Sequence, residues 1–163
     1  MKTCKPLRFY LITCISLIAL CSKDVSAEAD NEEHTRFPSK QETLSFLKKN
    51  LPLAVKALEQ VKKNESDEQH DEVMYNFQNK LSDYFDLKEN DGLEAAELYL
   101  SGLNIDLRMN LLLYHYHEDA KNSEERKKLI IQIRSLLKKR LENVKQEYSL
   151  SLLKRAQKFD RGA

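Results

Sequence analysis

The chain has 163 residues with a formal net charge of +1, and 33% of its side chains are charged, which gives no overall indication of nucleic-acid binding. It contains three glycines, three prolines and no tryptophan, a composition that favours long helices. Its three cysteines, Cys4, Cys14 and Cys21, all lie in the first 27 residues. If that segment is removed, disulfides, a cysteine nucleophile and cysteine metal ligands are excluded from the remainder.

The amino end has the order of a secretory signal peptide. Residues 1–8 carry three basic and no acidic side chains, and residues 9–21 are apolar apart from one threonine and one serine. Val25-Ser26-Ala27 then offers small residues at a cleavage position. We therefore predict that residues 1–27 are cleaved and that the protein is exported, either to a periplasm or out of the cell.

Two alternatives concern a permanent attachment to the membrane. The apolar run of 13 residues is shorter than the ~20 residues that a membrane-spanning helix requires. A lipoprotein would be modified at Cys21, but the residue before it is a leucine, which is larger than the small residue usual there. We expect no stable transmembrane anchor after cleavage.

The mature chain, residues 28–163, is expected to consist of a flexible acidic lead over 28–38 and one helical domain over 39–163. Its charge is unevenly distributed. Residues 64–119 hold 3 basic and 14 acidic side chains, whereas residues 121–163 hold 13 basic and 5 acidic ones. Either the basic last helix packs along the acidic middle of the chain, or it presents a basic face to an anionic partner such as a membrane surface or an acidic protein.

The first predicted helix begins after Ser39, because Ser39 and Glu42 have the spacing of a capping box. Apolar residues follow at steps of three and four along one face: Leu44, Leu47, Leu51, Val55, Leu58 and Val61. Pro52 lacks a backbone N–H and disfavours helical geometry at the residue before it, so we expect a break near Asn50.

A second helix is predicted over residues 67–88, after Ser66, which has a glutamine three residues on. The residues that we expect it to bury are Val73, Phe77, Leu81, Tyr84 and Phe85. Gly92 suits a turn with a positive φ, and Asn90 or Asp91 could cap the helix that follows.

Residues 93–120 carry conflicting local signals. Apolar residues alternate with mostly polar ones over 103–113, as in a half-buried strand, but a helix also fits because two apolar stripes then result. The first contains Ala96, Leu100, Leu103, Leu107, Leu111 and Tyr114, and the second contains Leu98, Ile105, Met109, Leu112 and Tyr116. We favour a helix buried in the middle of a bundle, because no other segment offers a partner strand. Gly102 would permit close helix approach or a bend.

The last helix is predicted over residues 123–159, with Asn122 and Glu125 at its amino end. Its apolar positions at three-four spacing are Ile130, Ile133, Leu137, Leu141, Val144, Tyr148 and Leu152. At ~1.5 Å per residue it would be on the order of 55 Å long, so part of it should project or pair with another chain. The fold class is therefore all-α: a four-helix, hairpin-like bundle with a long C-terminal helix.

Metal-capable side chains cluster in the mature chain only over residues 114–119. On a helix His115 and Asp119 share a face, whereas His117 points elsewhere. The cluster is therefore either a zinc or copper site or an ordinary solvated helix end. His34 and His70 are isolated. No catalytic or phosphate-binding motif occurs, so we expect a protein that is not an enzyme and has no catalytic, cofactor or metal site.

The segment from Glu42 to Pro52, placed before three further helices, is similar to one found in uncharacterised exported charged-helix proteins of bacteria. More loosely, residues 39–159 resemble Spy/CpxP-type periplasmic chaperones and the related heavy-metal resistance sensors, but without the Leu-Thr-x-x-Gln repeats of those chaperones. The resemblance implies an interaction or chaperone-like envelope protein that binds other polypeptides or a second copy of itself. The charge balance gives no reason to expect a nucleic-acid partner. The alternative is a metal-responsive envelope sensor that uses His115 and His117.

Overall fold

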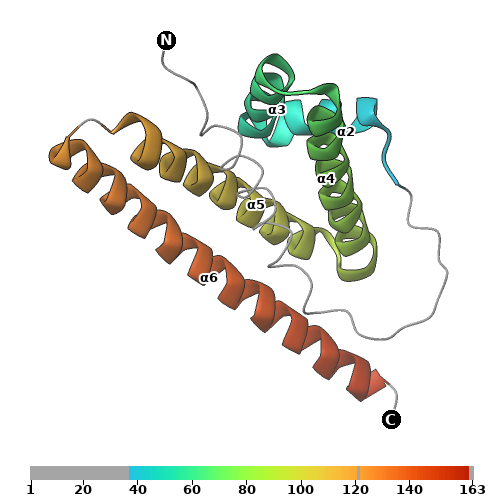
Figure 1. Cartoon of the computed structure of the whole chain (residues 1–163). Helices are drawn as coiled ribbons and strands as arrows, with labels where there is room; N and C mark the ends of the chain where they lie inside the picture. The colour runs from blue at the N-terminus through green and yellow to red at the C-terminus, as the bar shows by residue number, and fades with distance from the viewer. Residues whose placement is uncertain (1–36, 121, 162–163) are drawn as a thin grey trace. The chain divides into compact units, whose positions relative to one another are not determined.

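The structure is a computed structural model that describes residues 37–120 and 122–161. Within these ranges the chain forms helices and short connections and no strand, so the all-α prediction is confirmed (Figure 1). The chain divides into two compact units between Asp83 and Tyr84. The predicted signal peptide and most of the acidic lead lie outside the described residues.

The first unit opens with α2, Lys40–Asn50, which begins at the predicted capping box. The Ser39 hydroxyl accepts a hydrogen bond from the Glu42 backbone N–H at 3.2 Å, and the Glu42 carboxylate accepts one from the Ser39 N–H at 2.9 Å. Both N–H groups would otherwise lack a partner at the helix end. The buried Thr43 hydroxyl donates to the Ser39 carbonyl at 2.9 Å and fixes the same turn.

The predicted break at Pro52 is confirmed. Helix α2 ends at Asn50, Leu51 has non-helical φ and ψ of −134° and 64°, and Pro52 is the first residue of α3, Pro52–Asn64. At that position the missing N–H of proline costs no hydrogen bond. The buried apolar residues of the two helices are Leu47, Leu51, Ala54, Leu58 and Val61.

Helix α4, Asp67–Asp86, starts after the predicted cap at Ser66, whose hydroxyl accepts from the Gln69 N–H at 3.3 Å. Within the first unit, buried Gln78 donates to the Pro38 carbonyl at 2.7 Å. Lys40 also donates to Asp71 at 2.8 Å, and this contact lowers the pKa of the Asp71 carboxyl below its usual value.

The predicted buried face of α4 needs two corrections. Val73, Leu81 and Tyr84 are buried, but Phe77 is only half-buried and Phe85 is 38% exposed. Adjacent residues on a helix point about 100° apart, so Tyr84 and Phe85 cannot both face the same side. Tyr84 takes the buried position, and Phe85 contacts its ring from the edge at a centroid distance of 5.6 Å.

The second unit continues through a π-helical turn, Leu87–Asp91, to Gly92, whose φ of +87° confirms the predicted turn. The predicted side-chain cap from Asn90 or Asp91 is wrong, because Gly92 itself is the N-cap residue of the next helix and has no side chain to donate or accept.

That next helix, α5, spans Leu93–Tyr114 and is followed by a second π-helical turn, His115–Asp119. The long last helix, α6, spans Ser123–Arg161 and packs side by side against α5 (Figure 1). At its start Asn122 accepts from the Glu125 N–H at 2.9 Å, as predicted.

Helix α5 is a helix, as favoured, but it is not buried all round. Only Ala96 and Gly102 are fully buried, most of its apolar side chains are half-buried, and Leu111 is 40% exposed. The reason is that the only long helix packed against α5 within its own unit is α6, and one neighbour covers one face.

Candidate interaction surface

Arg140 holds together a polar network on the side of α6 that faces α5. Its Nε donates to the Asp106 carboxylate at 3.3 Å, and its Nη1 donates to the Asn143 side-chain oxygen at 2.7 Å and to Glu147 at 3.2 Å. Asn143 is only 5% exposed and donates to the Leu98 carbonyl at 2.9 Å. Because a buried amide is costly to leave without hydrogen bonds, this network fixes how the two helices align.

Gly102 of α5 lies against this network. A Cβ added there would be 2.8 Å from the Asn143 side-chain oxygen and 3.0 Å from Arg140 Nη1. The prediction that Gly102 permits close helix approach is therefore confirmed, since a larger residue would push the network away.

The charges at the α5–α6 contact follow the first of the two predicted arrangements, in which basic residues of the last helix meet acidic ones of the middle region. Besides Arg140 and Asp106, Lys154 of α6 lies 3.4 Å from the Asp91 carboxylate. Glu147 departs from this arrangement, because it is an acidic residue of α6 itself. Burial raises the pKa of the Glu147 carboxyl, and the nearby Arg140 only partly offsets that effect.

The exposed apolar residues of α6 form a stripe of their own. Five of the predicted apolar positions are from 43% to 65% exposed: Leu137, Leu141, Val144, Tyr148 and Leu152. We call these five residues the α6 stripe. At 3.6 residues per turn it lies roughly a third of a turn around the helix from Arg140, Asn143 and Glu147. The sequence pattern placed these five residues correctly on one face, but that face is not the one that packs against α5. The other two predicted positions, Ile130 and Ile133, are half-buried.

The packed face of α6 corresponds to a second row of residues in the sequence. Half-buried or buried residues recur at three-four spacing over Ile133, Leu136, Arg140, Asn143, Glu147, Leu150 and Lys154. A hydrophobicity pattern misses this row because four of its seven members are polar.

Four basic residues border the α6 stripe, and all are exposed. Arg134 and Arg155 lie three residues beyond its two ends, and Lys138 and Lys145 run along one side. We call these four the basic border. Lys145 pairs with Glu142 at 2.8 Å, whereas the other three make no ion pair within the described part of the chain.

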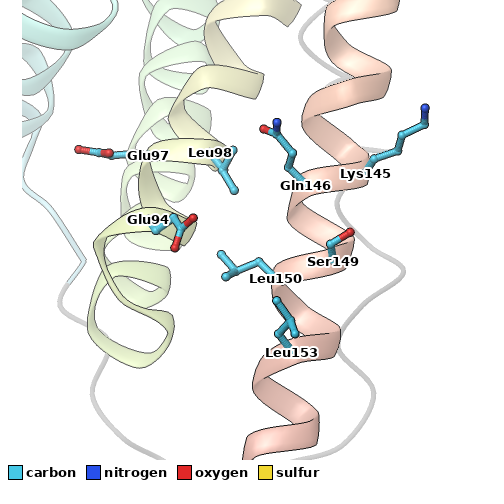
Figure 2. Close-up of a pocket in the computed structure, with 8 residues that line it drawn as sticks. All are labelled: Glu94, Glu97, Leu98, Lys145, Gln146, Ser149, Leu150 and Leu153. Carbon is cyan, nitrogen blue, oxygen red and sulfur yellow. The ribbon is translucent and has the colours of Figure 1, made fainter.

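A shallow groove of about 550 Å³ runs between α5 and α6 near residues 94–98 and 145–153. Figure 2 shows Leu98 and Leu150 between the two helices and Leu153 at the edge of α6, with Glu97 and Lys145 directed outward. A neighbouring hollow of about 480 Å³ continues along the same pair of helices past Ser101. The groove is open and apolar at its base, which suits a side chain of a partner better than a buried small ligand.

The histidine cluster forms part of the π-helical turn after α5. His115 and Asp119 are paired through Nδ1 and a carboxylate oxygen, which confirms that they share a face. The ring of His117 packs edge-on against that of Tyr116, with 5.2 Å between the ring centroids. Among residues 37–120 and 122–161, no group of three or more histidine, aspartate or glutamate side chains is placed to hold one metal ion.

Comparisons with known proteins add no family. No family model, no curated protein and no solved structure matches the chain. Among the described residues no helix is both long and apolar enough to cross a membrane.

Proposed function

We propose that this protein is an exported, non-enzymatic helical protein that binds other polypeptides in the cell envelope. The observation that carries the proposal is the α6 stripe, in which five apolar side chains, each at least 43% exposed, follow one another at helical spacing. Contiguous exposed apolar surface is unfavourable in water and is typical of sites that bind other proteins. The amino-terminal sequence pattern supports export.

The mode of binding that fits is helix recognition. An amphipathic segment of a partner can cover a narrow apolar row with its own apolar side chains at positions i, i+3, i+4 and i+7. An unfolding polypeptide exposes such segments, so a chaperone-like activity is the broader form of the same function.

The test uses residues 28–163 and a disulfide-containing client that aggregates when it is reduced. We expect the wild-type protein to suppress light scattering by the client at near-equimolar concentration. The double variant Leu141→Glu, Tyr148→Glu should lose this effect, since it places two charges in the α6 stripe.

The matched control is Ile131→Glu. Ile131 is 66% exposed on the same helix but lies off the α6 stripe, so its variant places one charge elsewhere and is compared charge for charge with Leu141→Glu alone. Circular dichroism of each variant shows whether it remains folded. The proposal is wrong if wild-type protein does not suppress aggregation, or if the control loses as much activity as the double variant.

A further inference from the structure

We infer that the α6 stripe and its basic border together dock an acidic amphipathic helix of another polypeptide. This inference rests on the proposed function and names the chemistry of the partner.

The spacing of the α6 stripe is that of a coiled-coil seam. From Leu137 to Leu152 its members are four, three, four and four residues apart, which covers about two heptads and roughly 22 Å of helix. A helix that lies on a membrane surface instead presents an apolar face at least ~100° wide. The two other strongly exposed apolar residues of α6, Ile131 and Leu153, lie away from the stripe and do not widen it.

The basic border determines the charge of the partner. In paired helices the residues beside the apolar seam meet across the interface, and opposite charges there set partner choice. Lys138 and Lys145 occupy one such side, and Arg134 and Arg155 lie at the two ends. Arg134, Lys138 and Arg155 make no ion pair in the ranges that the structure covers, so their charges are free to meet carboxylates.

The same border argues against a second copy of this chain. On the stripe's other side, Arg140 and Glu147 are already held in the network that faces α5. Two copies joined stripe to stripe would bring two basic borders together with no exposed acidic row to oppose them. Like charges facing each other across an interface are destabilising, and a helix lined with glutamate avoids that repulsion.

The experiment compares two fluorescently labelled three-heptad peptides with residues 28–163. Both have leucine at positions a and d; one has glutamate at e and g, and the other has lysine there. Repulsion between like charges keeps each peptide from pairing with itself, so its apolar face remains available. Fluorescence anisotropy gives the two dissociation constants at low and at high salt.

We expect the glutamate peptide to bind at least roughly tenfold more tightly than the lysine peptide, with a preference that falls as salt rises. Leu141→Glu should abolish binding of the glutamate peptide. Ile131→Glu should weaken it far less, because it adds one charge near Arg134 without placing a charge in the α6 stripe. The charge-reversed pair Arg134→Glu, Lys138→Glu should weaken it roughly tenfold.

A second pair of substitutions distinguishes an effect of the basic border from an effect of total charge. Lys128→Glu with Lys139→Glu changes the total charge by the same amount on another side of α6, where both lysines are exposed. This pair should weaken binding much less than the border pair. Equal losses from the two pairs would show that only overall charge matters and would overturn the inference.

The remaining outcomes are also decisive. If both peptides bind with equal affinity and Leu141→Glu abolishes binding of both, the partner need not be acidic and the inference is overturned. The proposed binding of polypeptides at the α6 stripe would then still hold. Binding of neither peptide overturns the inference, and the aggregation assay then decides the proposed function separately. Tight binding to anionic phospholipid vesicles that Leu141→Glu abolishes, or dimerisation by light scattering that it abolishes, identifies a different occupant and overturns the inference as well.

Discussion

Removing the buried amide of Asn143 should measurably weaken the α5–α6 pairing. The substitution Asn143→Ala removes two hydrogen bonds of the Asn143 side chain: a neutral one to the Leu98 carbonyl and a charge-assisted one from Arg140. The first contributes about 1 kcal/mol and the second about 1.5–3 kcal/mol to the free energy of unfolding. Alanine regains about 0.6 kcal/mol of helix propensity. The expected net loss is therefore about 2–3.5 kcal/mol.

The assay is urea denaturation of residues 28–163 followed by circular dichroism, with Gln132→Ala as the control. Gln132 is an exposed polar residue of α6, and its replacement should change stability by no more than about 0.5 kcal/mol. Hydrogen exchange of peptides from α5 and α6 should show that the loss is located in this hairpin. A change below about 1 kcal/mol, or one that the control reproduces, would refute the view that the network holds the two helices in place.

Three further predictions concern single side chains. Because burial raises the pKa of the Glu147 carboxyl, its ionisation costs stability. Relative to Glu147→Gln, the wild-type protein should therefore lose stability as the pH rises through and above 4.5, the ordinary pKa of a glutamate. Equal pH profiles of the two proteins in urea denaturation would contradict this. Gly102→Ala should destabilise the protein by about 1 kcal/mol, because steric overlap with Asn143 outweighs a gain in helix propensity of about 1 kcal/mol. A rise in melting temperature would show that the Asn143 side chain moves aside at little cost. Ser39→Ala should cost about 1 kcal/mol through the lost cap of α2, measured by urea denaturation, whereas no change would mean that water replaces the hydroxyl.

The local features of the fold could be predicted from sequence because each depends on residues close together in the chain. A serine with glutamate or glutamine three residues on marked two helix starts, Asn122 marked a third, and Pro52 marked the break between α2 and α3. These signals act through backbone groups within one turn, so no knowledge of packing was needed.

The packed face of α6 could not be predicted in the same way. Both the α6 stripe and the row through Arg140 and Asn143 have helical spacing, and the apolar one was the more conspicuous. The choice depends on groups far apart in sequence: Asn143 reaches the Leu98 carbonyl, and Gly102 leaves room for it. Hydrophobic periodicity carries no information about such contacts, which is also why α5 was expected to be more buried than it is.

A docking role for the α6 stripe requires that the stripe be open in the free protein. From residue 28 onward the chain has no cysteine, so a single introduced thiol can be followed alone. The measurement is the rate at which a thiol reagent labels Leu141→Cys in residues 28–163, compared with Ile131→Cys, which is exposed, and Leu136→Cys, which is half-buried. We predict that Leu141→Cys reacts about as fast as Ile131→Cys. A rate as slow as that of Leu136→Cys would mean that the α6 stripe is already covered, and would contradict its role as a free docking surface.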